Sequence, residues 1–181
     1  MAEDLIQRLN RGDQGALREI YERFRHDLLT LAVCLLGDVA AAEDVLHDTF
    51  VAFAASAPKL KVRSNLRGYL VAWVANRARD QLRRRKREFG DAGPSPAHGS
   101  DPLTDLIADE ESQRLYGALA RLPYEQREVI TLHLHGEMTF RQVARQLGVR
   151  QNTVQSRYRY GIEKLRSLLK TEERSCVPQK K

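Results

Sequence analysis

Two stretches of the chain combine cationic, amide and aromatic side chains at spacings that suit nucleic-acid binding. The first, residues 65–87, brings Tyr69, Trp73 and Asn76 together with a run of arginines. Aromatic rings can stack on the bases of a single strand while guanidinium groups pair with its phosphates. In the alternative interpretation both rings pack in a hydrophobic core, and only the polar side chains are left to bind a ligand.

The second stretch, residues 139–160, has the pattern of a helix-turn-helix. Ala144 is small where two helices must cross closely, Gly148 can take the turn, and Val154 supplies an apolar anchor for the second helix. The second helix of such a motif enters the major groove with its N-terminal residues facing the base edges. The residues on that side are polar and basic here, which favours DNA binding over an ordinary helical hairpin.

The chain offers little for catalysis. Glu43, His47 and Asp48 could begin a metal site of a nuclease, but no further ligand set is evident, and neither a nucleophile–base constellation nor a phosphate-cradling glycine loop occurs. The two cysteines, Cys34 and Cys176, form no CxxC pattern and fit a reducing compartment. We therefore expect a non-enzyme without metal or cofactor.

The elements that must position these side chains are predicted to be helices throughout. The chain has 181 residues, 42% hydrophobic and 30% charged, and its apolar residues recur at spacings of three and four with almost no strand-like alternation. Asp13 and Asp38 are predicted N-caps, and Thr139 with Gln142 has the pattern of a capping box. The predicted helices span residues 3–11, 14–36, 39–57, 65–87, 103–122, 123–135, 140–147 and 151–171.

A segment rich in Gly, Pro, Ser and Asp interrupts the helical pattern after residue 88. We therefore predict an all-α protein of two small helical domains, the second containing the helix-turn-helix. The domains are 1–88 and 103–174, joined by a flexible linker at 89–102 and followed by a tail at 175–181.

Charge is distributed unevenly along the chain. Residues 1–58 carry 5 basic and 10 acidic side chains, residues 59–87 carry 11 and 1, and residues 124–181 carry 12 and 6. Two separated basic blocks predict two contacts with a polyanion, most simply nucleic acid. The acidic patch around Glu43 and Asp44 indicates either a solvated helix face or a surface for a basic protein partner.

Hydropathy argues against membrane insertion. No run of about 18 apolar residues occurs, and the first residues are acidic, unlike those of a secretory signal. We expect a cytoplasmic protein.

Four segments together resemble the conserved regions of one protein family. Residues 42–50, Ala-Glu-Asp-Val-Leu-His-Asp-Thr-Phe, resemble region 2.2 of bacterial RNA polymerase sigma factors, and residues 65–70 followed by 75–84 resemble regions 2.3 and 2.4. Residues 122–129 resemble the opening of region 4, and residues 153–157 resemble part of its recognition helix. In this order they are similar to the sigma-70 family, in particular to the extracytoplasmic-function (ECF) group, which keeps only regions 2 and 4.

The resemblance implies three sets of contacts. Core polymerase, through the β′ clamp helices, is expected to contact Glu43, Asp44, His47 and Asp48. The melted −10 strand is expected to contact Leu60, Lys61, Arg63, Asn76, Arg77, Arg79, Arg83 and Arg84. The duplex −35 element is expected to contact Arg141, Arg145, Gln151, Asn152, Thr153, Gln155, Ser156, Arg157 and Arg159.

Helical spacing refines the −35 set. Gln151, Gln155, Ser156 and Arg159 lie on or near one face, where they can reach base edges, whereas Tyr158 is predicted to pack against the preceding helix. Arg141, Arg145 and Arg157 are predicted to meet phosphates or acidic neighbours.

The implied function is to bind core polymerase, direct it to promoters and assist promoter melting. The implied partners include the polymerase β flap and, as a regulator, an anti-sigma factor. The alternative, a stand-alone helix-turn-helix regulator, explains residues 139–160 but leaves residues 65–87 and the acidic patch without a role.

Overall fold

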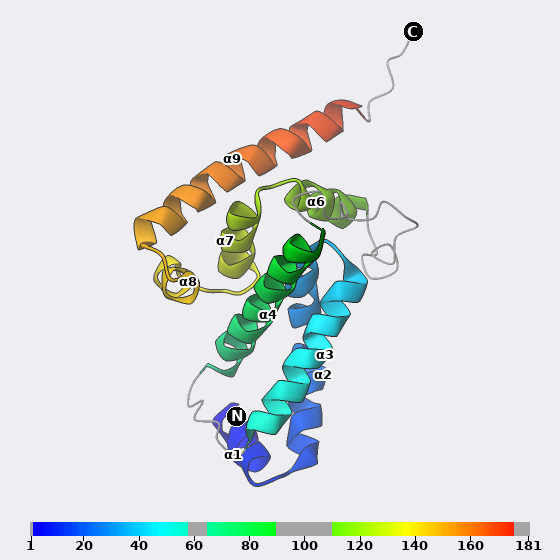
Figure 1. Ribbon diagram of the computed structural model, residues 1–181, viewed down its shortest axis with the longest axis vertical. Helices are drawn as coiled ribbons and strands as arrows, with labels where there is room; N and C mark the ends of the chain where they lie inside the picture. Colours follow the sequence, from blue (N-terminus) through cyan, green and yellow to red (C-terminus); the bar gives the residue numbers. More distant parts are fainter. Residues whose placement is uncertain (1, 58–64, 90–109, 176–181) are drawn as a thin grey trace. The chain divides into compact units, whose positions relative to one another are not determined.

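The computed structural model describes residues 2–57, 65–89 and 110–175, and the regular structure within these ranges is helical (Figure 1). This confirms the predicted all-α class. The chain divides into two compact units, Met1–Ser95 and Pro96–Lys181. The first contains α1 (Ala2–Asn10), α2 (Gln14–Leu36), α3 (Val39–Ser56) and α4 (Leu66–Phe89), and the second contains α6 (Glu110–Ala120), α7 (Tyr124–Leu134), α8 (Phe140–Leu147) and α9 (Gln151–Ser175).

The junction between α1 and α2 is held by a cap and two ion pairs. The Asp13 carboxylate accepts hydrogen bonds from the backbone N–H groups of Gly15 and Ala16 at the start of α2. Arg8 on α1 pairs with Asp13 at 2.9 Å and with Glu19 at 3.2 Å. The predicted cap at Asp13 is therefore confirmed, and it also ties the short first helix to α2.

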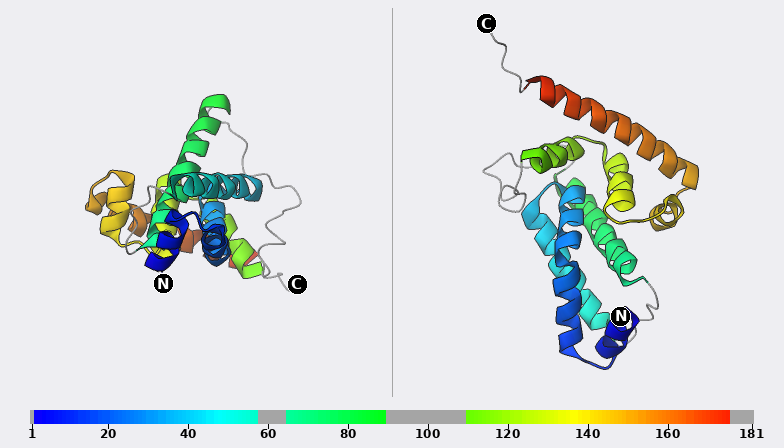
Figure 2. Two further views of the ribbon diagram at one scale, coloured as in Figure 1. Left: turned by 90° about the horizontal axis from the view of Figure 1, so that it is seen from below. Right: turned by 180° about the vertical axis from the view of Figure 1, so that it is seen from behind.

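The first unit is built around α2, which packs against α1, α3 and α4 (Figures 1 and 2). Its apolar residues recur every three or four positions, so they form one stripe along the helix. Burying a Leu, Ile or Phe side chain contributes roughly 1.5–3 kcal/mol each. The buried stripe comprises Ala16, Ile20, Phe24, Leu28, Leu31 and Leu35.

A tight turn joins α2 to α3 and makes them an antiparallel pair (Figure 1). Gly37 has a φ of 69°, and its N–H donates to the Val33 carbonyl. Glycine adopts this left-handed conformation without the penalty that a Cβ imposes. Asp38 then caps α3 by accepting from the N–H of Ala41 at 2.9 Å, as predicted.

In the second unit, α9 packs against α6, α7 and α8. The core joins Val129 and Leu132 of α7 to Val143 of α8 and Val154 of α9, none of which is exposed to solvent. One buried polar side chain of α7 is paired within the helix: Glu128 accepts a hydrogen bond from the Tyr124 hydroxyl at 3.0 Å. The predicted start of α6 at residue 103 lies outside the described residues.

Within the described ranges, no helix is both long enough and apolar enough to span a membrane.

The Arg8–Asp13 pair makes the stability of the first unit depend on pH. The hydrogen bond from Arg8 lowers the pKa of the Asp13 carboxyl below its ordinary value of 3.8. The stabilisation is thus fully present above pH 3.8 and is lost as the pH falls through the lowered pKa. Asp13→Asn keeps a capping oxygen but removes the charge. We expect it to lower the urea midpoint at pH 7, with the deficit shrinking between pH 4 and pH 2; a deficit independent of pH would contradict this role.

Candidate functional site

The helix-turn-helix predicted from the sequence is present as α8, a three-residue turn and α9. Thr139 and Gln142 form the predicted capping box at the start of α8. Gly148 ends that helix with a φ of 67°, and its N–H donates to the Ala144 carbonyl. Val154 is fully buried and anchors α9 beneath α8. The motif requires a small residue, a residue with left-handed backbone conformation and an apolar anchor, and Ala144, Gly148 and Val154 supply them in that order.

The start of α9 presents its polar side chains to solvent. Gln151, Asn152, Gln155 and Arg159 are exposed, and Thr153, Ser156 and Arg157 are half-buried. The Ser156 hydroxyl donates a hydrogen bond to the Thr153 carbonyl at 3.0 Å, so its donor is already used within the helix. Arg141 and Arg145 lie exposed on α8.

An aromatic cluster fixes α9 against α7 and α8. The His133 ring stacks on Phe140 with centroids 4.3 Å apart, and Tyr158 meets both rings edge-on at 5.1 and 5.2 Å. His133 Nδ1 lies 2.7 Å from the Met138 carbonyl oxygen, in hydrogen-bond contact. The prediction that Tyr158 packs inward is confirmed.

Arg159 has a neighbour that spacing alone did not indicate. Its Nη2 donates to the Tyr160 hydroxyl at 3.2 Å, and its guanidinium carbon lies 4.9 Å from the centre of the Tyr160 ring. Tyr160 is itself 53% exposed. The tyrosine thus restrains the arginine on the surface of α9.

The first unit presents the acidic patch on α3. Glu43, Asp44, His47 and Asp48 are all exposed, while Val45 and Leu46 between them are buried. The carboxylates therefore lie on the outer side of a helix whose opposite side is fixed in the core.

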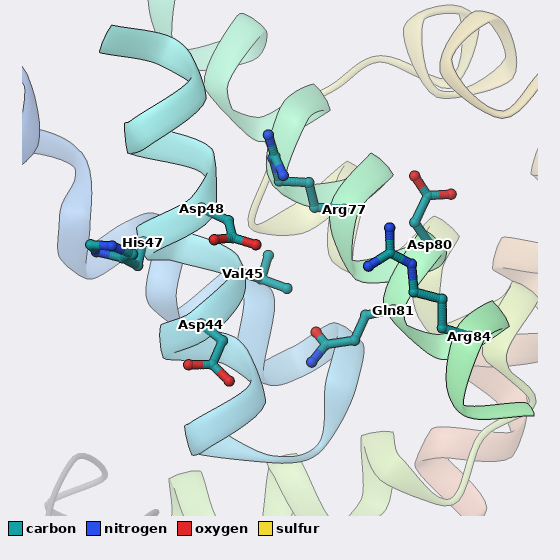
Figure 3. Close-up of a pocket in the computed structure, with 8 residues that line it drawn as sticks. All are labelled: Asp44, Val45, His47, Asp48, Arg77, Asp80, Gln81 and Arg84. Atoms are coloured by element: carbon teal, nitrogen blue, oxygen red, sulfur yellow. The ribbon is translucent and has the colours of Figure 1, made fainter. Parts of the chain in front are cut away.

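A groove of about 330 Å³ runs between α3 and α4 (Figure 3). From α3 it is lined by Asp44, Val45, His47 and Asp48, and from α4 by Arg77, Asp80, Gln81 and Arg84. In Figure 3 the Asp48 carboxylate and the Arg84 guanidinium both point into the space between the two helices. Three residues assigned by resemblance to polymerase binding, Asp44, His47 and Asp48, thus share one groove with Arg77 and Arg84, which were assigned to DNA binding.

Other polar residues of α4 lie on a different side of the helix. Asn76 and Arg83 are exposed, and Arg79 is half-buried. Arg79 donates to the Asn76 side-chain oxygen at 3.3 Å, and Arg83 pairs with Asp80 at 2.7 Å. Asn76 therefore lies beside the cationic side chain of Arg79, a suitable setting for a base edge next to a phosphate.

Tyr69 and Trp73 pack where α3 meets α4. The centre of each ring lies 6.4 Å from that of Phe53, and the two centres are 5.3 Å apart. Both rings therefore make packing contacts, but neither is a fully buried core residue, so the structure bears out the core interpretation only in part. Both are only half-buried, so part of each ring still faces solvent.

Three residues of the expected −10 set, Leu60, Lys61 and Arg63, lie outside the described residues. The structure gives the hypothesis of a metal-dependent nuclease no support: across the described ranges, no group of three or more His, Cys, Asp or Glu side chains is placed to hold a metal.

Comparison with known proteins identifies the family. Residues 20–88 match sigma-70 region 2, and residues 112–165 match sigma-70 region 4. Together the two matches cover more than half of the chain. The chain belongs to the sigma-70 family of RNA polymerase sigma factors, in its ECF group, and directs RNA polymerase in transcription initiation.

Named relatives and solved structures agree. ECF RNA polymerase sigma factor SigK of Mycobacterium tuberculosis is 28% identical over 176 residues, covering 91% of each chain. SigW of Bacillus subtilis is 24% identical over 182 residues, covering 94% of this chain and 97% of that protein. The fold is similar to that of the sigma factor RpoE of Bartonella quintana, solved with the anti-sigma factor NepR (TM-score 0.66, 24% identity, 84% of this chain and 98% of that one). It is also similar to CnrH, solved with the cytosolic domain of CnrY (TM-score 0.68, 24% identity, 93% and 97%).

Sequence reasoning missed Gln81 in the groove and Tyr160 beside Arg159. The spacing of Arg77, Gln81 and Arg84 by four and three residues was a usable signal, because such positions share one side of a helix. Nothing in the sequence indicates the Tyr160 contact, since adjacent helical residues normally point apart.

The position of α9 depends on a glycine that contacts α7. A Cβ at Gly161 would lie 2.7 Å from Ile130 Cδ1 and 3.1 Å from Gln126 Cβ, whereas a Cβ at Gly117 on α6 would meet nothing within 4 Å. We expect Gly161→Val to cost about 1–3 kcal/mol through overpacking and to weaken −35 binding. The matched Gly117→Val should stay within roughly 0.5 kcal/mol of wild type. Thermal unfolding followed by circular dichroism measures both, and equal stability of the two variants would refute the close approach.

Proposed function

We propose that the two units divide promoter recognition, with the first binding core polymerase and the melted −10 strand and the second binding the duplex −35 element. The observation that carries this division is the presence of one exposed, chemically distinct polar surface in each unit. The first unit shows carboxylates on α3 and cations on α4, and the second shows amides and cations at the start of α9.

The α3 patch is proposed to dock on the β′ clamp helices. Glu43, Asp44, His47 and Asp48 are exposed together, and among the residues in the described ranges none of the four has an ion-pair partner. Unpaired surface carboxylates keep their full attraction for a basic partner. The rigid core below them fixes their spacing, which favours a specific protein contact.

The −10 strand is proposed to lie along the side of α4 that carries Asn76, Arg79 and Arg83. Asn76 can donate to and accept from a base edge, and Arg79 and Arg83 beside it can pair with phosphates. Leu60, Lys61 and Arg63, which precede α4, complete this proposed site. Unstacking a base costs a few kcal/mol, and a protein pocket with stacking worth about 1–3 kcal/mol per base can offset that cost. No catalytic step by the chain itself is required.

The −35 duplex is proposed to receive the start of α9 in its major groove. Gln151, Gln155 and Arg159 are exposed at successive turns of the helix. An amide pairs bidentately with adenine and a guanidinium with guanine. Asn152, Thr153 and Ser156 lie beside them, and Arg141, Arg145 and Arg157 flank them as phosphate contacts.

The relatives support a proposal for regulation and location. RpoE and CnrH were each solved with a protein partner, named an anti-sigma factor for RpoE and the cytosolic domain of CnrY for CnrH. We propose that a protein of the anti-sigma class likewise covers the polymerase-binding surface of this chain, that the β flap contacts the second unit, and that the chain acts in the cytoplasm.

Charge reversal tests polymerase docking. We expect Asp44→Lys with Asp48→Lys to weaken binding of the full chain to core polymerase by about 10- to 100-fold, because the cationic side chains would face a basic partner. The measurement is a fluorescence titration with core polymerase, with circular dichroism as a check on helicity. Unchanged affinity together with unchanged helicity would remove α3 from the docking surface.

Arg159 and Arg145 of the second unit should have different roles in DNA binding. Arg159→Ala is expected to relax the preference at one or two −35 positions by about 1–3 kcal/mol. Arg145→Ala should weaken binding to all sequences alike and reduce the salt slope by about one. Holoenzyme selection from a randomised −35 library at two salt concentrations distinguishes these outcomes. If Arg159→Ala lowers affinity uniformly across the library, the proposed reading face is wrong.

A further inference from the structure

The arginines of α4 fall into two groups by their partners. All but two have a bond within the described residues: Arg67 with Asp27, Arg79 with Asn76, Arg83 with Asp80, Arg85 with Asp38, and Arg87 with the Arg83 carbonyl. Arg77 and Arg84 have neither an ion pair nor a hydrogen bond among the residues that the structure describes. These two are the arginines that line the groove between α3 and α4.

The opposite wall carries charges that are equally unpaired. Asp44 and Asp48 lie one turn apart on α3 and pair with no cation in the described part of the chain. The groove is lined by the carboxylates of Asp44 and Asp48 on α3 and by Arg77, Arg84 and Asp80 on α4, and Asp80 is paired with Arg83. The carboxylate oxygens of Asp44 and Asp48 lie more than 4.0 Å from the guanidinium nitrogens of Arg77 and Arg84. The packing of α3 and α4 on α2 sets this separation, so the side chains remain available to a partner.

Gln81 adds a polar group without a hydrogen bond at its Oε1 to the α4 wall. Its Oε1 is shielded from water and has no hydrogen-bond donor. A buried acceptor without a donor is unfavourable. A hydrogen-bond donor on a partner that enters the groove can satisfy this acceptor.

We infer that this groove is the second half of the polymerase-binding surface, and that Arg77, Gln81 and Arg84 bind core polymerase rather than DNA. The occupant is a segment of core polymerase that carries both signs of charge, with Lys or Arg facing Asp44 and Asp48 and with Asp or Glu facing Arg77 and Arg84. This inference rests on the proposed docking of α3, which it extends to a second helix.

Charge argues against DNA as the occupant. A phosphate that reached Arg77 or Arg84 inside the groove would also approach Asp44 and Asp48, which repel it. Asn76, Arg79 and Arg83 lie on another side of α4, away from the α3 carboxylates. A partner with positive and negative side chains can pair with the aspartates of α3 and with the arginines of α4, as is usual for complementary protein interfaces.

The test compares Arg84→Glu with Arg87→Glu, an equal change of charge on an exposed arginine of the same helix that does not line the groove. Both full-length variants are titrated with core polymerase. The expected result is a loss of about tenfold or more for Arg84→Glu and less than about twofold for Arg87→Glu. Arg84→Gln, which removes the charge without reversing it, should show a smaller loss, and circular dichroism checks the fold.

A second measurement separates polymerase from DNA. At saturating core polymerase, binding of a −10 single-stranded oligonucleotide should be unchanged in Arg84→Glu. Wild-type core affinity with weakened oligonucleotide binding would assign Arg84 to DNA and overturn the inference. If Asp44→Lys with Asp48→Lys lowers core affinity but Arg84→Glu behaves like Arg87→Glu, the groove is not used while α3 docking stands. If the aspartate variant retains its core affinity, the proposed docking itself fails.

Discussion

Burial of the apolar stripe of α2 is the interaction on which the surface of the first unit depends. Ile20, Leu28, Leu31 and Leu35 are almost completely shielded from solvent, and each contributes roughly 1.5–3 kcal/mol. Because α3 and α4 both pack on this helix, their polar sides must emerge next to each other. The groove with carboxylates on one wall and guanidinium groups on the other is a consequence of that packing.

In the second unit, the position of α9 and of its exposed polar side depends on close contacts with α7 and α8. Gly148 makes the turn that lets α9 leave α8, and Val154 fixes the start of α9 in the core. About two turns further on, Gly161 brings α9 against Ile130 of α7. These contacts leave the first turns of α9 exposed on one side and packed against the core on the other, which is the arrangement that base readout requires.

Features set by local chemistry could be predicted from the sequence. The caps at Asp13, Asp38 and Thr139 depend on residues within one helical turn, and each forms as predicted. The helix-turn-helix was also predictable, because its small, glycine and apolar positions have a fixed spacing. The family followed from the order of several short motifs, each only moderately specific by itself.

Features that depend on packing between helices were not predictable. The density of arginines in residues 65–87 indicated a polyanion, but charge counts do not say which side of α4 each arginine occupies. Only the pairing of α4 with α3 shows that Arg77 and Arg84 lie opposite Asp44 and Asp48. The restraint of Arg159 by Tyr160 is similarly a property of side-chain conformation rather than of spacing.

The division of promoter recognition between two units is tested most directly by mapping transcription start sites. Core polymerase would be given genomic fragments with and without the chain, and the RNA 5′ ends compared. We expect discrete start sites that appear only with the chain and share sequence elements near −35 and −10. If the chain instead protects specific duplex sites by itself and leaves the start sites of core polymerase unchanged, it is a stand-alone regulator and the proposed division is wrong.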